Sequence, residues 1–70
     1  MLAQERQAAL RQALVTLPPE HKAVIELRHF QDQSYDEMAE TLGLSLATVK
    51  SRLFRARRHL RQILEKRGEA

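Results

Sequence analysis

The strongest constraint on this chain is a run of apolar residues in its C-terminal third, spaced three or four positions apart. Side chains with this spacing share one face of an α-helix. We therefore expect a helix over residues 46–66 whose apolar stripe packs against the rest of the chain. Such a helix is about 30 Å long, comparable with the width of a small domain, so the preceding segments must pack along it. The stripe consists of Leu46, Val49, Leu53, Ala56, Leu60, Ile63 and Leu64.

Positive charge is concentrated in the same C-terminal helix. Residues 46–67 carry eight basic side chains and one acidic one, whereas residues 1–45 carry four basic and seven acidic ones. The formal net charge of +3 at pH 7 therefore hides a strongly basic helix attached to an acidic remainder. Because the apolar stripe fills one face, the basic residues must lie on the others. A basic helix face indicates a partner that carries phosphates, such as a nucleic acid.

Composition limits both the fold and the chemistry. Seventy residues can form one small domain, with too little core for a deep substrate cleft. Two glycines, two prolines and few β-branched residues predict an all-α fold. The absence of cysteine excludes disulfides and thiolate metal sites and is compatible with a reducing cytoplasm. No apolar run reaches the roughly 20 residues that span a bilayer and no signal-peptide pattern opens the chain, so we expect no membrane partner.

Capping and turn residues divide the chain into helices. Pro18 and Pro19 end a first helix and begin a second, and Ser34 begins a third with a capping box. Gly43 suits the left-handed end of that helix, and Ser45 caps the last. The last two helices and their three-residue turn predict a helix-turn-helix with a long C-terminal recognition helix. We expect one compact four-helix domain over residues 1–70, with helices at about 2–16, 19–30, 35–42 and 46–66.

One edge of the expected recognition helix faces away from the apolar stripe and suits contact with bases. Arg55 can make two hydrogen bonds to guanine O6 and N7. Phe54 can contact a thymine methyl group, although it could instead form a second packing surface against the protein or a partner. Lys50 and Ser51 lie one turn earlier, within reach of base edges. The candidate base-contacting residues are therefore Lys50, Ser51, Phe54 and Arg55.

A second set of polar residues suits DNA phosphates, which supply affinity and register rather than sequence. In the first turn of the third helix, Ser34 and Tyr35 lie beside backbone amides that can bind a phosphate. Asp36 and Glu37 would repel one, so we expect them to act in capping and to face away. The candidate phosphate-contacting residues are Thr48, Arg52, Arg57, Arg58, Ser34 and Tyr35.

Three motifs, taken together, resemble a known family. They are the segment 17–28, with Leu-Pro at its start and Leu-Arg at its end, the Ser-Tyr-Asp-Glu-Met-Ala segment 34–39, and the Thr-Val-Lys-Ser-Arg-Leu-Phe-Arg-Ala-Arg segment 48–57. In order and spacing they resemble region 4 of bacterial extracytoplasmic-function (ECF) sigma factors. The resemblance covers about residues 10–64, nearly the whole chain.

The resemblance implies a domain that reads the −35 promoter element of duplex DNA in the major groove, in the bacterial cytoplasm, while attached to core RNA polymerase. It implies docking on the flap of the polymerase β subunit and, often, masking by an anti-sigma factor. In this family the positions of Lys50, Ser51, Phe54 and Arg55 approach bases, and those of Thr48 and Arg52 approach phosphates. Lys50 stands where arginine is common, and lysine acts more as a point charge. A complete sigma factor also has an upstream domain that melts the −10 region, so we interpret the chain as an isolated C-terminal domain, with a free-standing sigma-like regulator as the alternative.

Two other functions fit part of the pattern. The output domain of a response regulator shares the four-helix plan and a Thr-Val-Lys start of the recognition helix, but the Phe-Arg-Ala-Arg continuation and the proline-led second helix favour a sigma factor. A protein-interaction module could use the apolar stripe as a coiled coil. That stripe is needed to cover the other helices and spans under three heptads, so we expect the isolated domain to be monomeric.

An enzyme is the function that the sequence supports least. His21, His29 and His59 are far apart and have no paired carboxylate or cysteine at ligand spacing. The chain has no glycine-rich phosphate loop. We therefore expect no catalytic residue, no metal and no cofactor.

Overall fold

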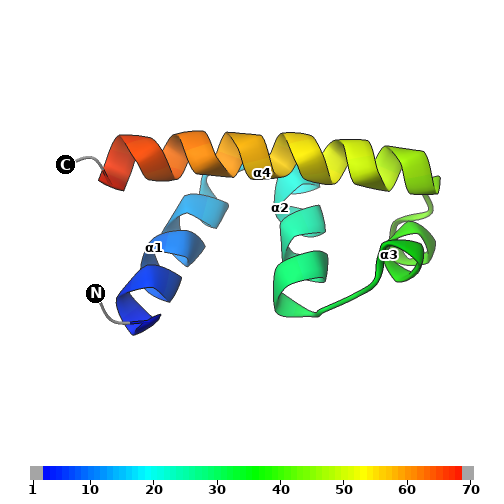
Figure 1. Ribbon diagram of the computed structural model, residues 1–70, viewed down its shortest axis with the longest axis horizontal. Helices are drawn as coiled ribbons and strands as arrows, with labels where there is room; N and C mark the ends of the chain where they lie inside the picture. Colours follow the sequence, from blue (N-terminus) through cyan, green and yellow to red (C-terminus); the bar gives the residue numbers. More distant parts are fainter. Residues whose placement is uncertain (1–2, 69–70) are drawn as a thin grey trace.

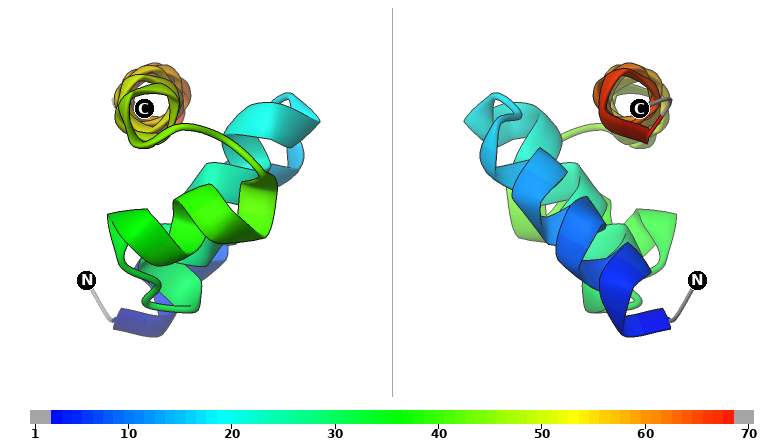
Figure 2. Two further views of the ribbon diagram at one scale, coloured as in Figure 1. Left: turned by 90° about the vertical axis from the view of Figure 1, so that its right-hand side faces the viewer. Right: turned by 90° about the vertical axis from the view of Figure 1, so that its left-hand side faces the viewer.

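A long C-terminal helix lies across three shorter helices in the computed structural model, which describes residues 3–68 (Figure 1). When α4 is viewed along its axis, the other helices lie together on one side of it (Figure 2). The predicted all-α fold with a helix-turn-helix is confirmed. The expected start of the first helix at residue 2 lies outside the described residues. The elements are α1 (Ala3–Val15), α2 (Pro19–Ile25), the π-helical turn η1 (Glu26–Phe30), α3 (Tyr35–Leu42) and α4 (Leu46–Gly68).

Local hydrogen bonds explain where α3 begins and ends. The Glu37 amide donates to Ser34 Oγ over 3.1 Å, and the Ser34 amide donates to Glu37 Oε1 over 2.7 Å, which is the predicted capping box. At the other end Gly43 takes φ 67°, ψ 36°, and the Leu44 amide donates to the Ala39 carbonyl over 3.0 Å. This left-handed end turns the chain toward α4 within three residues.

The second helix ends in a wider turn than the sequence pattern predicts. The Gln31 amide donates to the carbonyl of Glu26, five residues back, over 3.0 Å, which makes η1 a π-helical turn. Arg28 stabilises the exit from this turn, because its Nη1 donates to the Gln33 carbonyl over 3.0 Å. Asp32, in the connection to α3, takes a positive φ of 58°. The π-helical turn rotates the side chains of η1 relative to an α-helical continuation.

The core lies between α4 and the layer of α1, α2 and α3, with α2 packed most extensively on α4. The apolar stripe of α4 is buried from Val49 to Leu60, whereas Leu46 remains 39% exposed. The expectation that Leu46 belongs to the packed stripe is therefore wrong, because this first turn of α4 lies beside a surface hollow at the start of α3. The buried residues are Ala13, Leu14, Leu17, Val24, Ile25, Leu27, Met38, Val49, Leu53, Ala56 and Leu60.

Within the described part of the chain, no helix combines the length and the apolar character that crossing a membrane requires.

Candidate nucleic-acid interface

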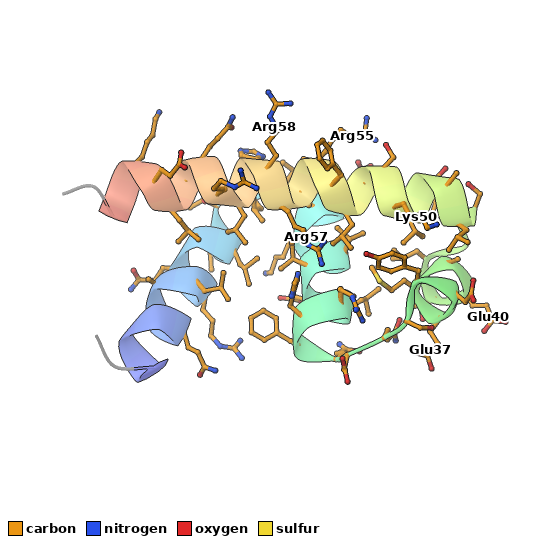
Figure 3. All side chains as sticks on the ribbon, viewed as in Figure 1. Glu37, Glu40, Lys50, Arg55, Arg57 and Arg58 are labelled. Atoms are coloured by element: carbon orange, nitrogen blue, oxygen red, sulfur yellow. The ribbon has the colours of Figure 1, made fainter. Side chains whose placement is uncertain are left out.

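The four candidate base-contacting residues share one exposed strip of α4. Lys50, Ser51, Phe54 and Arg55 are all exposed, and Phe54 leaves 66% of its surface in solvent. Figure 3 shows Arg55 projecting from α4 away from the other helices, whereas Lys50 lies on the side of α4 that faces α3. The strip therefore presents hydrogen-bond donors and one aromatic ring, and the opposite face of α4 packs against the core.

The turn before α4 fixes how this strip is presented. Ser45 caps the helix as predicted, because the Thr48 amide donates to Ser45 Oγ over 3.1 Å. The Ser45 hydroxyl in turn donates to Thr48 Oγ1 over 2.8 Å. Thr48 still has its own hydroxyl proton to donate, so its capping contact leaves it able to bind a phosphate oxygen. Val49, fully buried in the next position, anchors this first turn to the core.

A groove along one flank of α4 brings candidates of both kinds together. It is lined by Lys50 and Phe54 from the predicted base-contacting set and by Tyr35, Arg57 and Arg58 from the predicted phosphate-contacting set; Leu53 and Arg61 complete the lining. The concentration of basic side chains around two aromatic rings makes this groove attractive to a phosphate backbone. Arg61 was not among the predicted site residues, although it lies on the same helical flank as Lys50 and Arg57, which was the signal that could have identified it.

Arg57 is held in the groove by a histidine of η1. Its Nε donates to His29 Nε2 over 3.2 Å, which requires His29 to be neutral with this nitrogen unprotonated. Burial lowers the pKa of His29 below 6.5, and the charges of Arg57 and Arg28 lower it further. The hydrogen bond uses only one of the five guanidinium N–H donors, so Arg57 keeps donors for a phosphate while this contact favours one orientation of its side chain.

A second hollow joins the start of α3 to α4. It is lined by Arg28, Ser34, Tyr35, Asp36, Leu46 and Lys50. The guanidinium of Arg28 lies 5.4 Å from the centre of the Tyr35 ring, a cation–π contact that adds a positive charge beside the predicted phosphate contacts. Arg28 was not predicted here, because only the fold brings η1 beside α3.

Some of the acidic residues and candidate phosphate contacts lie at these hollows, and others do not. Figure 3 shows Glu37 pointing away from α4, as expected, but Asp36 lines the second hollow. The Ser34 amide is occupied by Glu37, so it is not open to a phosphate in this arrangement. Arg52 is half-buried and lies outside the lining of both hollows.

These features define a class of protein: helix-turn-helix domains whose second helix exposes basic side chains around an aromatic ring. The chain belongs to the sigma-70 region 4 family, whose model matches residues 7–60. The resemblance drawn from the three sequence motifs is thereby confirmed.

Curated relatives agree with this family. Over 60 residues, 86% of this chain and 35% of the relative, the chain is 47% identical to the RNA polymerase sigma factor YlaC of Bacillus subtilis (strain 168). Over 59 residues, 84% of this chain and 23% of the relative, it is 46% identical to the ECF RNA polymerase sigma factor SigE of Mycolicibacterium smegmatis. The chain thus spans about a quarter to a third of the length of these proteins.

Proposed function

We propose that this domain binds duplex DNA at the −35 promoter element, as region 4 of an ECF sigma factor, and so directs RNA polymerase to start transcription. The observation that carries the proposal is the exposed strip of Lys50, Ser51, Phe54 and Arg55 on α4. Membership of the sigma-70 region 4 family supports the same function. A major groove about 12 Å wide admits one α-helix, and the outer side of α4 carries the exposed Phe54 and Arg55.

In the proposed complex the two sets of residues act differently. Lys50, Ser51, Phe54 and Arg55 meet base edges in the major groove and give sequence preference. The flanking residues meet the phosphates and set affinity and register. In this complex the protein groove lined by Arg57, Arg58 and Arg61 would lie along the sugar-phosphate backbone of the DNA. The phosphate set comprises Thr48, Arg52, Arg57, Arg58, Ser34 and Tyr35, to which the structure leads us to add Arg61 and Arg28.

The two other functions considered from the sequence are less well supported. The family match over residues 7–60 favours a sigma factor over the output domain of a response regulator. A coiled coil would need the apolar stripe of α4, but Val49, Leu53, Ala56 and Leu60 are buried inside the domain. Pairing through that stripe would require the domain to open.

The proposed partners follow from the proposed function. Core RNA polymerase, through the flap of its β subunit, would hold the domain over the promoter in the bacterial cytoplasm. An anti-sigma factor would compete for the domain. The positive surface of α4 supports an acidic partner of either kind, DNA or protein.

Selection of duplex DNA from a random pool, with and without core polymerase, tests the proposed function. We expect one preferred sequence to be enriched, and more strongly when polymerase is present. Enrichment that does not depend on polymerase would favour a response-regulator-type protein. If no sequence is enriched in either arm, the domain does not read DNA.

A salt titration tests the phosphate contacts separately. The logarithm of the binding constant falls linearly with the logarithm of the salt concentration, by about 0.9 for each phosphate neutralised on duplex DNA. If most of the five arginines among the candidate phosphate contacts bind phosphates, the slope should be roughly −3 to −4.5. A slope near zero would contradict binding through the basic flank of α4.

A further inference from the structure

Two histidines that the sequence separates by 38 positions meet between α2 and α4. His21 Nδ1 and His59 Nδ1 lie 3.4 Å apart, and their rings stand at 89° with their centres 5.5 Å apart. Both side chains are half-buried. The expectation that the histidines lie far apart is therefore wrong for this pair, because α2 packs its first turn against the middle of α4.

The spacing of the two nitrogens matches the edge of a tetrahedral metal site. Two imidazole nitrogens at about 2.0–2.1 Å from Zn²⁺, with a tetrahedral angle between them, are about 3.3–3.4 Å apart. A right angle at the metal would bring them to about 2.9 Å. Without an ion, the same contact is a hydrogen bond in which one Nδ1 is protonated and the other is not, and 3.4 Å is long for such a bond.

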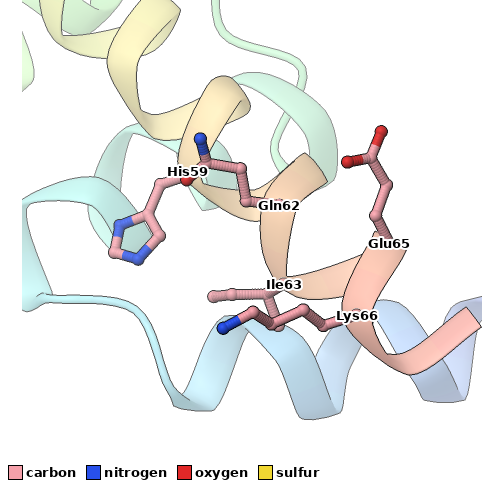
Figure 4. Close-up of a pocket in the computed structure, with 5 residues that line it drawn as sticks. All are labelled: His59, Gln62, Ile63, Glu65 and Lys66. Carbon is pink, nitrogen blue, oxygen red and sulfur yellow. The ribbon is translucent and has the colours of Figure 1, made fainter.

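We propose that His21 and His59 form a two-histidine site that binds Zn²⁺ through both Nδ1 atoms. Within the described residues no further carboxylate or histidine joins them in a group of three metal-binding side chains, so water supplies the remaining ligands. Solvent reaches the site, because His59 also lines an open hollow with Gln62, Ile63, Glu65 and Lys66 (Figure 4). Glu65 points away from the His59 ring in this view.

The bound ion would tie α2 directly to the recognition helix. The unfolded chain does not hold the two imidazoles together, since they are 38 positions apart, so Zn²⁺ binds the folded state more tightly and stabilises it. The site lies on the flank of α4 that meets α2, one helical turn beyond Arg55. Zn²⁺ should therefore stabilise the packing of α2 on α4.

Urea unfolding of the tag-free chain in buffered free Zn²⁺ tests the proposal, with Mg²⁺ as the control ion. Once Zn²⁺ exceeds the dissociation constant, each tenfold increase should shift the unfolding equilibrium about tenfold toward the folded state. His21→Gln and His59→Gln should each abolish this shift. His29→Gln is the matched control and should retain it, because His29 contacts Arg57 and not the pair.

Three results would overturn the site. These are no shift with Zn²⁺, an equal shift with Mg²⁺, or a shift that persists in His59→Gln. Nuclear magnetic resonance of the unaltered chain provides a second measurement in case a variant does not fold. Zn²⁺ should perturb the imidazole signals of His21 and His59 together and leave those of His29 in place; perturbation of His29 alone would also overturn it.

Discussion

Phe54 leaves 66% of its surface in solvent, whereas Phe30 and Tyr35 are half-buried. A large apolar side chain in that position gives up the stabilisation that burial would provide, which is reasonable if DNA covers it. We expect replacement of the facing thymine by uracil to weaken binding, because the methyl contact is lost. Phe54→Ala should change the free energy of unfolding by no more than about 0.5 kcal/mol. Unchanged binding to the uracil site would leave Phe54 as a protein-contact residue.

Arg55 and Arg58 form a matched pair for separating base contacts from phosphate contacts. Both project from α4 away from the other helices (Figure 3), so neither substitution disturbs the core. Arg55→Ala should cost roughly 1–3 kcal/mol of binding free energy on the preferred sequence and little on random DNA. Arg58→Ala should weaken both equally and reduce the salt slope by about 1. Equal losses for Arg55→Ala on both DNAs would make it a phosphate contact.

His29 should make the stability of the domain depend on pH. Burial and the charges of Arg57 and Arg28 hold its pKa in the folded state below 6.5, so the unfolded chain binds more protons. Its contribution to the unfolding free energy is therefore complete above pH 6.5 and is lost as pH falls through the lowered pKa. Urea titrations at a series of pH values give the unfolding free energy of the wild type and of His29→Gln, and the two free energies should diverge in this range. If they change with pH in parallel, protonation of His29 does not oppose folding.

At the scale of single elements, the caps should carry measurable stability. Ser45→Ala removes the acceptor of the Thr48 amide at the start of α4 and should cost about 1 kcal/mol of unfolding free energy. Ser51→Ala is the control, because Ser51 is exposed in the second turn of the same helix and makes no cap; it should change stability by no more than about 0.5 kcal/mol. Chemical denaturation compares the two. Equal effects would show that the cap contributes nothing beyond helix propensity.

The elements that the sequence predicts well are those fixed by neighbouring residues. The capping box at Ser34 and the left-handed Gly43 depend on contacts within a few positions, so local patterns reveal them. The π-helical turn η1 is different, because no local pattern in Glu26–Phe30 indicates the hydrogen bond from the Gln31 amide to the Glu26 carbonyl. The contact between Arg57 and His29 also requires the packed fold. Residue type and helical face could thus predict the exposed strip of α4. They could not predict which flanking residues form hydrogen bonds to other helices, as Arg57 does with His29.

At the scale of the whole molecule, binding should follow the packing of α4 on the other helices. Leu53 is 1% exposed, and Leu53→Ala should cost about 2–5 kcal/mol of unfolding free energy. A domain of this size has only roughly 4–10 kcal/mol in total, so the melting temperature should fall and the unfolded fraction at 37 °C should rise. Leu46→Ala, at a position 39% exposed, is the control and should remain folded.

Circular dichroism and DNA titration on the same samples separate packing from direct contact. If Leu53 acts only by holding α4, the DNA affinity lost in Leu53→Ala should equal the loss of folded fraction, and cooling the sample should restore both together. Since Leu53 lies at the base of the groove that Lys50, Phe54 and Arg57 also line, its removal could instead collapse that groove. A variant that remains helical at low temperature but still fails to bind would show that the groove itself, and not just the folded helix, recognises DNA.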